Sequence, residues 1–309
     1  MKRSETVKFP NSVQLFKFCQ KVLSFQRNTK VNDQEVGDIL EFNPSDCSHW
    51  KRGERNIKSV FALAKLAEVM QIETAIVHDV ASGAIGLDEA FFEFQEAGSI
   101  KEAIAKANEE GPQAIKEARG RVESFVQAIH AQCEFTTPPL YLPEILRFFS
   151  FITTQPTDIV DRLTRVLKLK QGQYCIQFRK GDLKPQTRMS MTRDFAKIVF
   201  QAERERFPEL GPLSPNMAPF EEILFTSSLL IPKNLILDEM SKLDSRRNIV
   251  AELGALFWVP KSLISFQMQD VLRSGNRLTM TEKCTVTNDV NILSTSSTIS
   301  TQTDNATSF

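Results

Sequence analysis

Short amphipathic segments follow one another between residues 12 and 82, and they constrain the fold more than any other feature of the sequence. Apolar side chains recur three and four positions apart in each segment, which is typical of helices that bury one face. Asn32 and Asn43 stand where helix caps are expected. Pro44 suits a first helical position, and Gly53 suits the end of the same helix. The predicted helices cover residues 12–27, 33–40, 44–52, 59–71 and 73–82.

The second and third of these helices are expected to cross closely. Gly37 stands at the crossing, where a small side chain is needed, and Phe42 fills the turn between the two helices. Cys47 and Trp50 are three residues apart and therefore form the inward face of the third helix. The neighbouring helices contribute buried faces made of Val36, Ile39, Leu40, Leu63, Leu66, Ala67 and Met70.

This order of helix, small residue, turn and core spacing resembles the repressor-like (XRE-type) helix-turn-helix family, and the segment KRGERN at residues 51–56 adds to the resemblance. In such units the second helix of the motif lies in the major groove of DNA, and its N-terminal residues contact base edges. The resemblance implies that Pro44, Ser45 and His49 read bases, while basic residues after the helix contact phosphates. The predicted DNA-contacting residues are Pro44, Ser45, Asp46, Ser48, His49, Lys51, Arg52, Arg55, Asn56 and Lys58.

Charge is unevenly distributed along a chain whose net charge is zero. Residues 1–70 contain 12 Lys and Arg against 8 Asp and Glu, a modest excess of the sign that nucleic acid attracts. Three residues depart from the family pattern. Asp33 replaces a glutamine that contacts phosphate, and Glu41 replaces the glycine of the turn. Asp46 places a carboxylate on the reading helix, where it either accepts a hydrogen bond from cytosine or repels phosphate.

The rest of the chain is expected to contain a helical connector, a second globular domain and a polar tail, so the fold class is mainly α. The N-terminal five-helix domain covers residues 1–83. Residues 84–135, punctuated by Gly98 and Gly111-Pro112, are expected to form a connector or dimerisation arm. Residues 136–275 form an α+β, mostly helical domain, and the Ser/Thr-rich residues 276–309 a disordered tail. The second domain's predicted elements are helices over 140–150, 157–168, 190–206, 219–229, 233–241, 245–253 and 260–273, a strand over 174–178 and a hairpin-like turn over 179–182.

Two segments of this second domain resemble the metallopeptidase-like (ImmA/IrrE-like) domain that accompanies many repressor-type units. Glu221 stands where that family has an acidic zinc ligand, eight residues before a Leu-Leu-Ile-Pro segment, and Val259–Ser262 resembles a later motif. The helix over 190–206 lacks the HExxH zinc motif, however. Its corresponding positions hold Lys197, Ile198 and Gln201 in one register, or Ile198, Val199 and Ala202 in the next. The sequence therefore predicts a degenerate domain without peptidase chemistry, in which Glu221 is solvated or paired with a cation.

Other chemistries find little support in the sequence. Phosphate-binding glycine motifs and a nucleophile elbow are missing, and Cys175 has no histidine near it in sequence. Residues 161–200 hold 10 Lys and Arg against 3 Asp and Glu, which indicates either a solvated face or a surface for DNA or an acidic partner. Scattered cysteines, no apolar leader and no long apolar run predict a cytoplasmic protein without a membrane span. No metal and no cofactor are predicted.

Three functions remain to be compared. The first is a DNA-binding transcriptional regulator of bacterial type that binds an operator as a homodimer, because two half-sites multiply specificity. Its second domain then senses a small ligand or a protein partner. The second is a non-catalytic protein–protein interaction module that does not bind DNA. A working metallopeptidase is the least favoured, because its metal ligands are missing.

Overall fold

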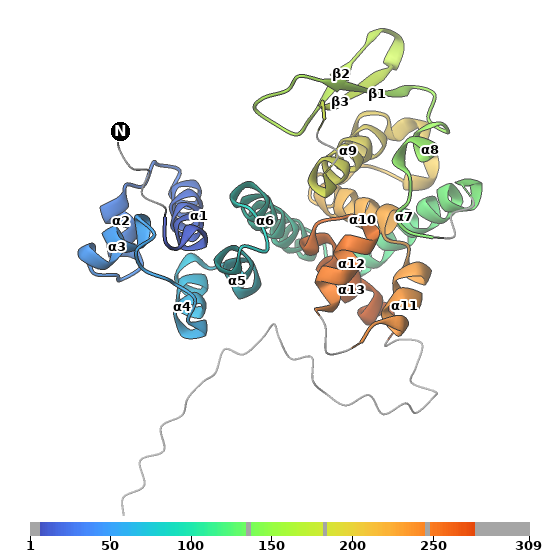
Figure 1. Cartoon of the computed structure of the whole chain (residues 1–309). Helices are drawn as coiled ribbons and strands as arrows, with labels where there is room; N and C mark the ends of the chain where they lie inside the picture. Colours follow the sequence, from blue (N-terminus) through green and yellow to red (C-terminus); the bar gives the residue numbers. More distant parts are fainter. Residues whose placement is uncertain (1–6, 134–136, 182–183, 245–247, 276–309) are drawn as a thin grey trace, which may run out of the picture. The chain divides into compact units, whose positions relative to one another are not determined.

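The structure is a computed structural model, and it describes residues 7–133, 137–181, 184–244 and 248–275. Within these ranges the protein is mainly helical, with thirteen α-helices and one three-stranded sheet (Figure 1). The described residues up to Asp270 form one compact unit, and the described residues from Val271 to Gly275 fall outside it. The tail predicted over residues 276–309 lies outside the described part of the chain.

The five helices predicted at the N-terminus are all present. They share one hydrophobic core, in which Trp50 is fully buried and contacts the ring of Phe16 edge-on at 5.2 Å. The indole Nε1 of Trp50 donates a hydrogen bond of 2.6 Å to the backbone oxygen of Ser12, so its polar atom is also satisfied. This contact ties the third helix to the first. The helices are α1 (Pro10–Arg27), α2 (Asp33–Ile39), α3 (Pro44–Lys51), α4 (Val60–Met70) and α5 (Thr74–Ser82).

Two glycines have the roles expected from the sequence. A Cβ added to Gly37 would lie 3.4 Å from the Sγ of Cys47, so α2 and α3 do cross closely there. Gly53 ends the segment that contains α3 with a φ of +71°, a conformation that favours glycine. A Cβ at Gly53 would also collide with the side chains of Val7 and Val13, the latter at 2.9 Å.

Two long helices follow, α6 (Leu87–Glu109) and α7 (Pro112–Cys133). The predicted interruption at Gly98 is wrong, because α6 runs through that residue. A single glycine costs a helix only about 1 kcal/mol, and buried side chains on both sides of Gly98 hold the helix together. The break at Gly111-Pro112 is confirmed, with Gly111 at a φ of +90°. The first turns of α6 belong to the N-terminal core, whereas Ile100, Ala103 and Ala107 belong to a second core.

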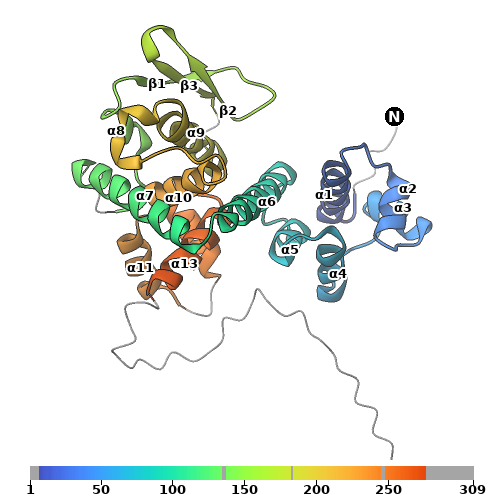
Figure 2. The same cartoon turned by 180° about the vertical axis from the view of Figure 1, so that it is seen from behind.

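The helices α7, α9 (Pro185–Lys197) and α10 (Ala218–Leu230) pack together (Figures 1 and 2). They form most of the second core, which carries most of the buried phenylalanines. The small sheet has the strand order β1-β3-β2, with β1 parallel and β2 antiparallel to the central β3. The elements of this region are α8 (Leu142–Leu146), β1 (Ile152–Thr157), β2 (Thr164–Lys168), β3 (Tyr174–Arg179), α9 (Pro185–Lys197), α10 (Ala218–Leu230), α11 (Lys233–Lys242), α12 (Ile249–Phe257) and α13 (Lys261–Gly275).

The sequence predicted several elements of this region incorrectly. The helix over 157–168 is wrong, because that range contains the end of β1, an irregular connection and β2. Cross-strand pairing with β3 outweighs the weak helical periodicity there. The turn predicted over 179–182 is present at Lys180 and Gly181, where Gly181 has a φ of +75°. It does not form a hairpin, however, since the hairpin of the sheet joins β2 to β3 through Lys170–Gly172. Asp182 lies outside the described residues.

The boundaries of other helices differ from those expected. The helix predicted over 190–206 begins earlier, at Pro185, and changes at Ile198–Ala202 into a π-helical turn. The helix expected over 140–150 is only α8, and that expected over 245–253 is α12, with residues 245–247 outside the described part.

The described helices were also compared with the thickness of a membrane. No single one is long and apolar enough to cross a bilayer, whereas α12 and the main part of α13 pass the length and composition test only as a bent pair.

Two glycine substitutions test the helix ends described above. Gly53→Ala is expected to lower the free energy of unfolding by about 1–3 kcal/mol, because the methyl group is strained at positive φ and collides with Val13. Gly98→Ala is the matched control, since nothing lies within 4 Å of the added Cβ. It is expected to stabilise the protein by about 0.5–1 kcal/mol. Urea unfolding measures both, and equal effects of the two substitutions would contradict this account.

Candidate functional site

The helix α3 is held by one face and exposed on the other. Cys47 and Trp50 are buried, and Phe42 packs at 5.4 Å from the Trp50 ring. Ser45, Ser48 and His49 lie on the opposite side and are exposed. The predicted inward and outward faces of this helix are therefore confirmed.

The turn before α3 is built from local hydrogen bonds. The side chain of Asn43 accepts a hydrogen bond of 3.0 Å from the backbone N–H of Ser45 and caps the helix. Glu41 has a φ of +55°, which is the left-handed conformation that glycine adopts most easily. The backbone N–H of Phe42 donates to the oxygen of Gly37 at 2.9 Å. The turn between α2 and α3 thus forms despite the unusual residue at position 41.

The predicted DNA-contacting residues lie on α3 and on the loop that follows it. Asp46 is half-buried, and the other nine are exposed. The Asn56 amide is engaged inside the bundle, because its Oδ1 accepts from the hydroxyl of Ser12 at 3.4 Å. This same hydroxyl accepts from the N–H of Ile57. Asn56 thus links the loop after α3 to α1, and its predicted contact with DNA stays a prediction.

Acidic neighbours hold three of the four predicted phosphate-binding cations. Lys51 pairs with Asp33, and Arg55 pairs with Asp46. The guanidinium of Arg52 lies 2.9 Å from the Glu54 carboxylate. Each pair is solvent-exposed, so each contributes little to stability but does cancel local charge.

Glu54 was missed by the sequence analysis. Its carboxylate contacts the Nδ1 of His49 as well as Arg52, and the hydrogen bond from His49 holds the pKa of Glu54 below its usual range. In the sequence, only its place between Arg52 and Arg55 could have indicated that Glu54 pairs with a cation. Residues 33–58 hold six Asp and Glu against four Lys and Arg, so the motif itself is acidic although residues 1–70 are basic.

The thiol of Cys47 is a poor candidate for a nucleophile. Burial raises its pKa, and the nearby carboxylates of Asp33 and Asp38 add to the effect. A thiol with a raised pKa stays protonated and is a poor nucleophile. Cys47 therefore serves packing against Gly37.

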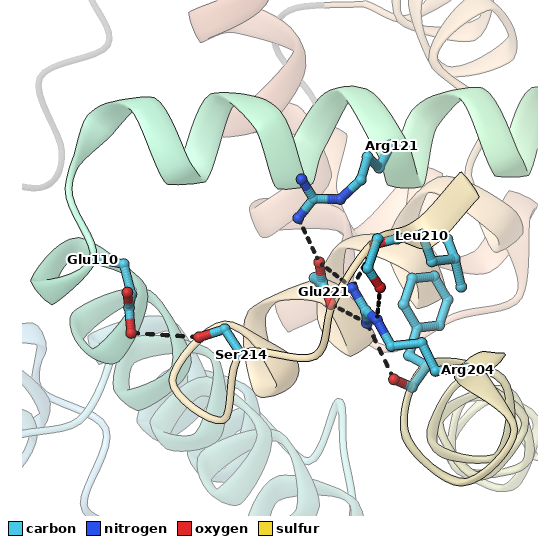
Figure 3. Close-up of polar contacts among 8 residues, drawn as sticks. Glu110, Arg121, Arg204, Leu210, Ser214 and Glu221 are labelled. Carbon is cyan, nitrogen blue, oxygen red and sulfur yellow. Dashed lines mark hydrogen bonds and ion pairs between the residues drawn. The ribbon is translucent and has the colours of Figure 1, made fainter. Parts of the chain in front are cut away.

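Glu221 in α10 is almost completely buried and binds two arginines (Figure 3). The Nη1 of Arg204 lies 2.7 Å from its Oε2, and the Nη2 of Arg121 lies 3.2 Å from its Oε1. Arg204 also donates to the backbone oxygens of Phe200, Leu210 and Gly211. A guanidinium thus occupies the space beside the carboxylate. Of the two predicted states of Glu221, solvated or paired with a cation, the structure shows the paired one.

The positions that correspond to the zinc motif carry no metal ligands. Ile198 and Val199 are buried apolar residues, and Gln201 donates to the carboxylate of Glu222. Among the residues that the structure describes, no group of three or more His, Cys, Asp or Glu side chains is arranged to hold a metal ion. Arg204, which the sequence analysis did not connect with Glu221, lies 17 residues before it, a separation without any local signal.

The chain and its fold were compared with known proteins. No protein-family model matches the sequence, and neither a curated protein nor a solved structure shows significant similarity to the chain. The two family resemblances therefore stay predictions.

The buried ion pair predicts a large effect on stability. Arg204→Met is expected to lower the free energy of unfolding by about 3–5 kcal/mol, because it leaves the buried carboxylate of Glu221 without its main partner. Replacing both residues, Arg204→Met with Glu221→Leu, is expected to recover part of this loss. Arg206→Met is the control: Arg206 is exposed and pairs with Glu203, so its loss is expected to cost about 1 kcal/mol or less. Equal losses for Arg204→Met and Arg206→Met in urea unfolding would refute the assigned role.

Proposed function

We propose that the protein is a sequence-specific DNA-binding regulator whose helix α3 reads the major groove. The observation that carries this proposal is the orientation of α3. Cys47 and Trp50 fix one face in the core, which leaves Ser45, Ser48 and His49 on the exposed face, where they can meet base edges. The Nδ1 of His49 contacts Glu54, so its base contact is expected through the rest of the ring. The short α2, the tight turn and the close crossing at Gly37 support a helix-turn-helix arrangement of the two helices.

The ion pairs of this surface shape the expected affinity. A DNA phosphate has to displace Asp33 from Lys51, Asp46 from Arg55 and Glu54 from Arg52 before those cations can bind it. This competition lowers binding to any sequence. Base contacts then supply a larger share of the affinity for the correct sequence. The proposed regulator is therefore weak on arbitrary DNA and depends on its operator.

The remaining parts of the proposal rest on the sequence. Residues 1–83 form the DNA-binding domain, 84–135 a connector or dimerisation arm, and 136–275 a non-catalytic domain related to metallopeptidases. Binding as a homodimer to an operator with two half-sites follows from the small number of bases that one α3 can read. The carboxylate–guanidinium contact of Glu221 and Arg204 supports a domain without zinc chemistry. A cytoplasmic location follows from the same composition argument as before.

The alternative is a protein-interaction module that does not bind DNA. One observation favours it: the helix-turn-helix segment is acidic, and three of its four cations are already paired. Val60 and Phe61 at the start of α4 are 70% and 87% exposed, so an apolar surface lies in the same domain. DNA binding measured directly separates the two proposals.

The reading face predicts base-selective losses. Ser45→Ala and His49→Ala are each expected to weaken binding to the selected operator by about 5- to 150-fold, the loss of one base contact of about 1–3 kcal/mol. Binding to random DNA should change little. Filter binding to a genomic fragment library, followed by titration of the selected site, measures both. Loss of the two affinities in equal proportion, or no selected site at all, would argue against α3 as the reading helix.

The paired carboxylate on α3 predicts a gain. Asp46→Asn is expected to tighten binding to random DNA by about 3- to 10-fold and to steepen its salt dependence, because it frees Arg55 for phosphate. Asp238→Asn on α11 is the matched control, since it makes the same charge change in an exposed ion pair with Lys242. Equal gains in both variants would show that only net charge matters. No gain in Asp46→Asn would show that Asp46 does not oppose phosphate.

A further inference from the structure

A polar cleft of about 1110 Å³ lies beside α9, on the side where the sheet and α6 approach it. Glu96 of α6, Arg165 of β2 and Gln186, Thr187 and Arg193 of α9 are among its lining residues. The cleft is thus built from three elements that are far apart in the sequence. Its volume is large enough for a metabolite-sized ligand.

Several buried polar atoms of the residues that line this cleft have no hydrogen-bond partner among the residues that the structure describes. The Oε1 of Gln186 and the Oγ1 of Thr187 are buried and unpaired, and these residues are only 7% and 1% exposed. A helix such as α9 normally buries apolar side chains at such positions. An unpaired buried acceptor or hydroxyl costs about 1–3 kcal/mol of stability. We therefore expect these groups to form hydrogen bonds with a bound ligand.

Arg193 has the same property on the donor side. Its Nη1 binds the carboxylate of Glu96 at 2.8 and 3.0 Å. Its Nε and Nη2 are buried and have no partner among the described residues. These two nitrogens form the fork of a guanidinium that binds a carboxylate or phosphate through two parallel hydrogen bonds.

Among the residues that line the cleft, seven Lys and Arg stand against five Asp and Glu, a small excess that favours an anion. Arg165 donates two hydrogen bonds, of 3.2 and 2.7 Å, to the neutral amide of Gln177 rather than to a carboxylate. The charge of Arg165 is thus not cancelled by this contact. Residues 161–200, which supply most of the lining, carry the largest basic excess noted in the sequence.

We propose that this cleft binds a small organic anion that carries a hydroxyl or amide donor next to its carboxylate or phosphate. The fork of Arg193 holds the anionic group, and Gln186 with Thr187 holds the neutral donor and acceptor. This proposal rests on the proposed function only where it makes the ligand the signal of the regulator. Binding itself is measured without DNA, so failure of one does not entail failure of the other.

Calorimetric titration of the full-length chain without DNA tests the site. The probes are glycerol 3-phosphate and malate, which combine an anionic group with a hydroxyl, together with inorganic phosphate and neutral glycerol. At least one of the first two is expected to bind about tenfold more tightly than phosphate, and glycerol not measurably. Absence of binding by both hydroxylated anions, or equal binding of phosphate and the better of them, would overturn the proposal.

Variants locate the binding within the cleft. Arg193→Lys keeps the charge but removes the fork, and it is expected to weaken binding of the better probe by about tenfold or more. Gln186→Glu places a carboxylate of nearly the same shape against the anion and is expected to weaken binding by a similar factor. Arg147→Lys, an exposed position outside the cleft lining, is the control. Undiminished binding in both cleft variants would refute the site, and thermal unfolding confirms that each variant is folded.

Discussion

The C-terminal half depends on the cost of removing Glu221 from water. A carboxylate that is almost completely buried is tolerated only when nearby cations and hydrogen bonds replace its hydration. Arg204 supplies both the positive charge and the hydrogen bonds. It also donates to the backbone oxygens of Leu210 and Gly211, which lie outside the α-helices. One guanidinium thus fixes the loop after α9 against α10. The buried carboxylate of Glu221 thus holds this loop and α10 together.

The N-terminal domain was predictable because its signals are local. A cap at Asn43, a proline after it and two inward residues three positions apart suffice to place α3 and to say which face is buried. The ion pairs of this surface were not predictable in the same way. Lys51 and Asp33 are 18 residues apart, and they meet only because α2 and α3 cross at Gly37.

Prediction failed where tertiary contacts decide between alternatives. The segment over 157–168 carries a faint helical pattern, but Val166 and its neighbours pair with β3 and form an edge strand. The unpaired atoms of Gln186 and Thr187 could not be seen in the sequence either, since a polar residue on a helix is normally taken as exposed. The apolar composition of α10 predicts that it is buried. The pairing of Glu221 with Arg204 could not be predicted, because it depends on how the loop between α9 and α10 folds.

The helix α6 links the two hydrophobic cores and therefore affects how the protein unfolds on heating. Its first turns complete one hydrophobic core and its last turns complete another, and Glu93 between them accepts hydrogen bonds from the backbone N–H groups of Lys261 and Ser262 at the start of α13. Because α6 contributes to both cores, its middle cannot unfold without disrupting both of them. The described residues up to Asp270 are therefore expected to unfold as one cooperative unit. A ligand that binds Arg193 as proposed would then stabilise α6, and with it both cores, through the contact between Arg193 and Glu96.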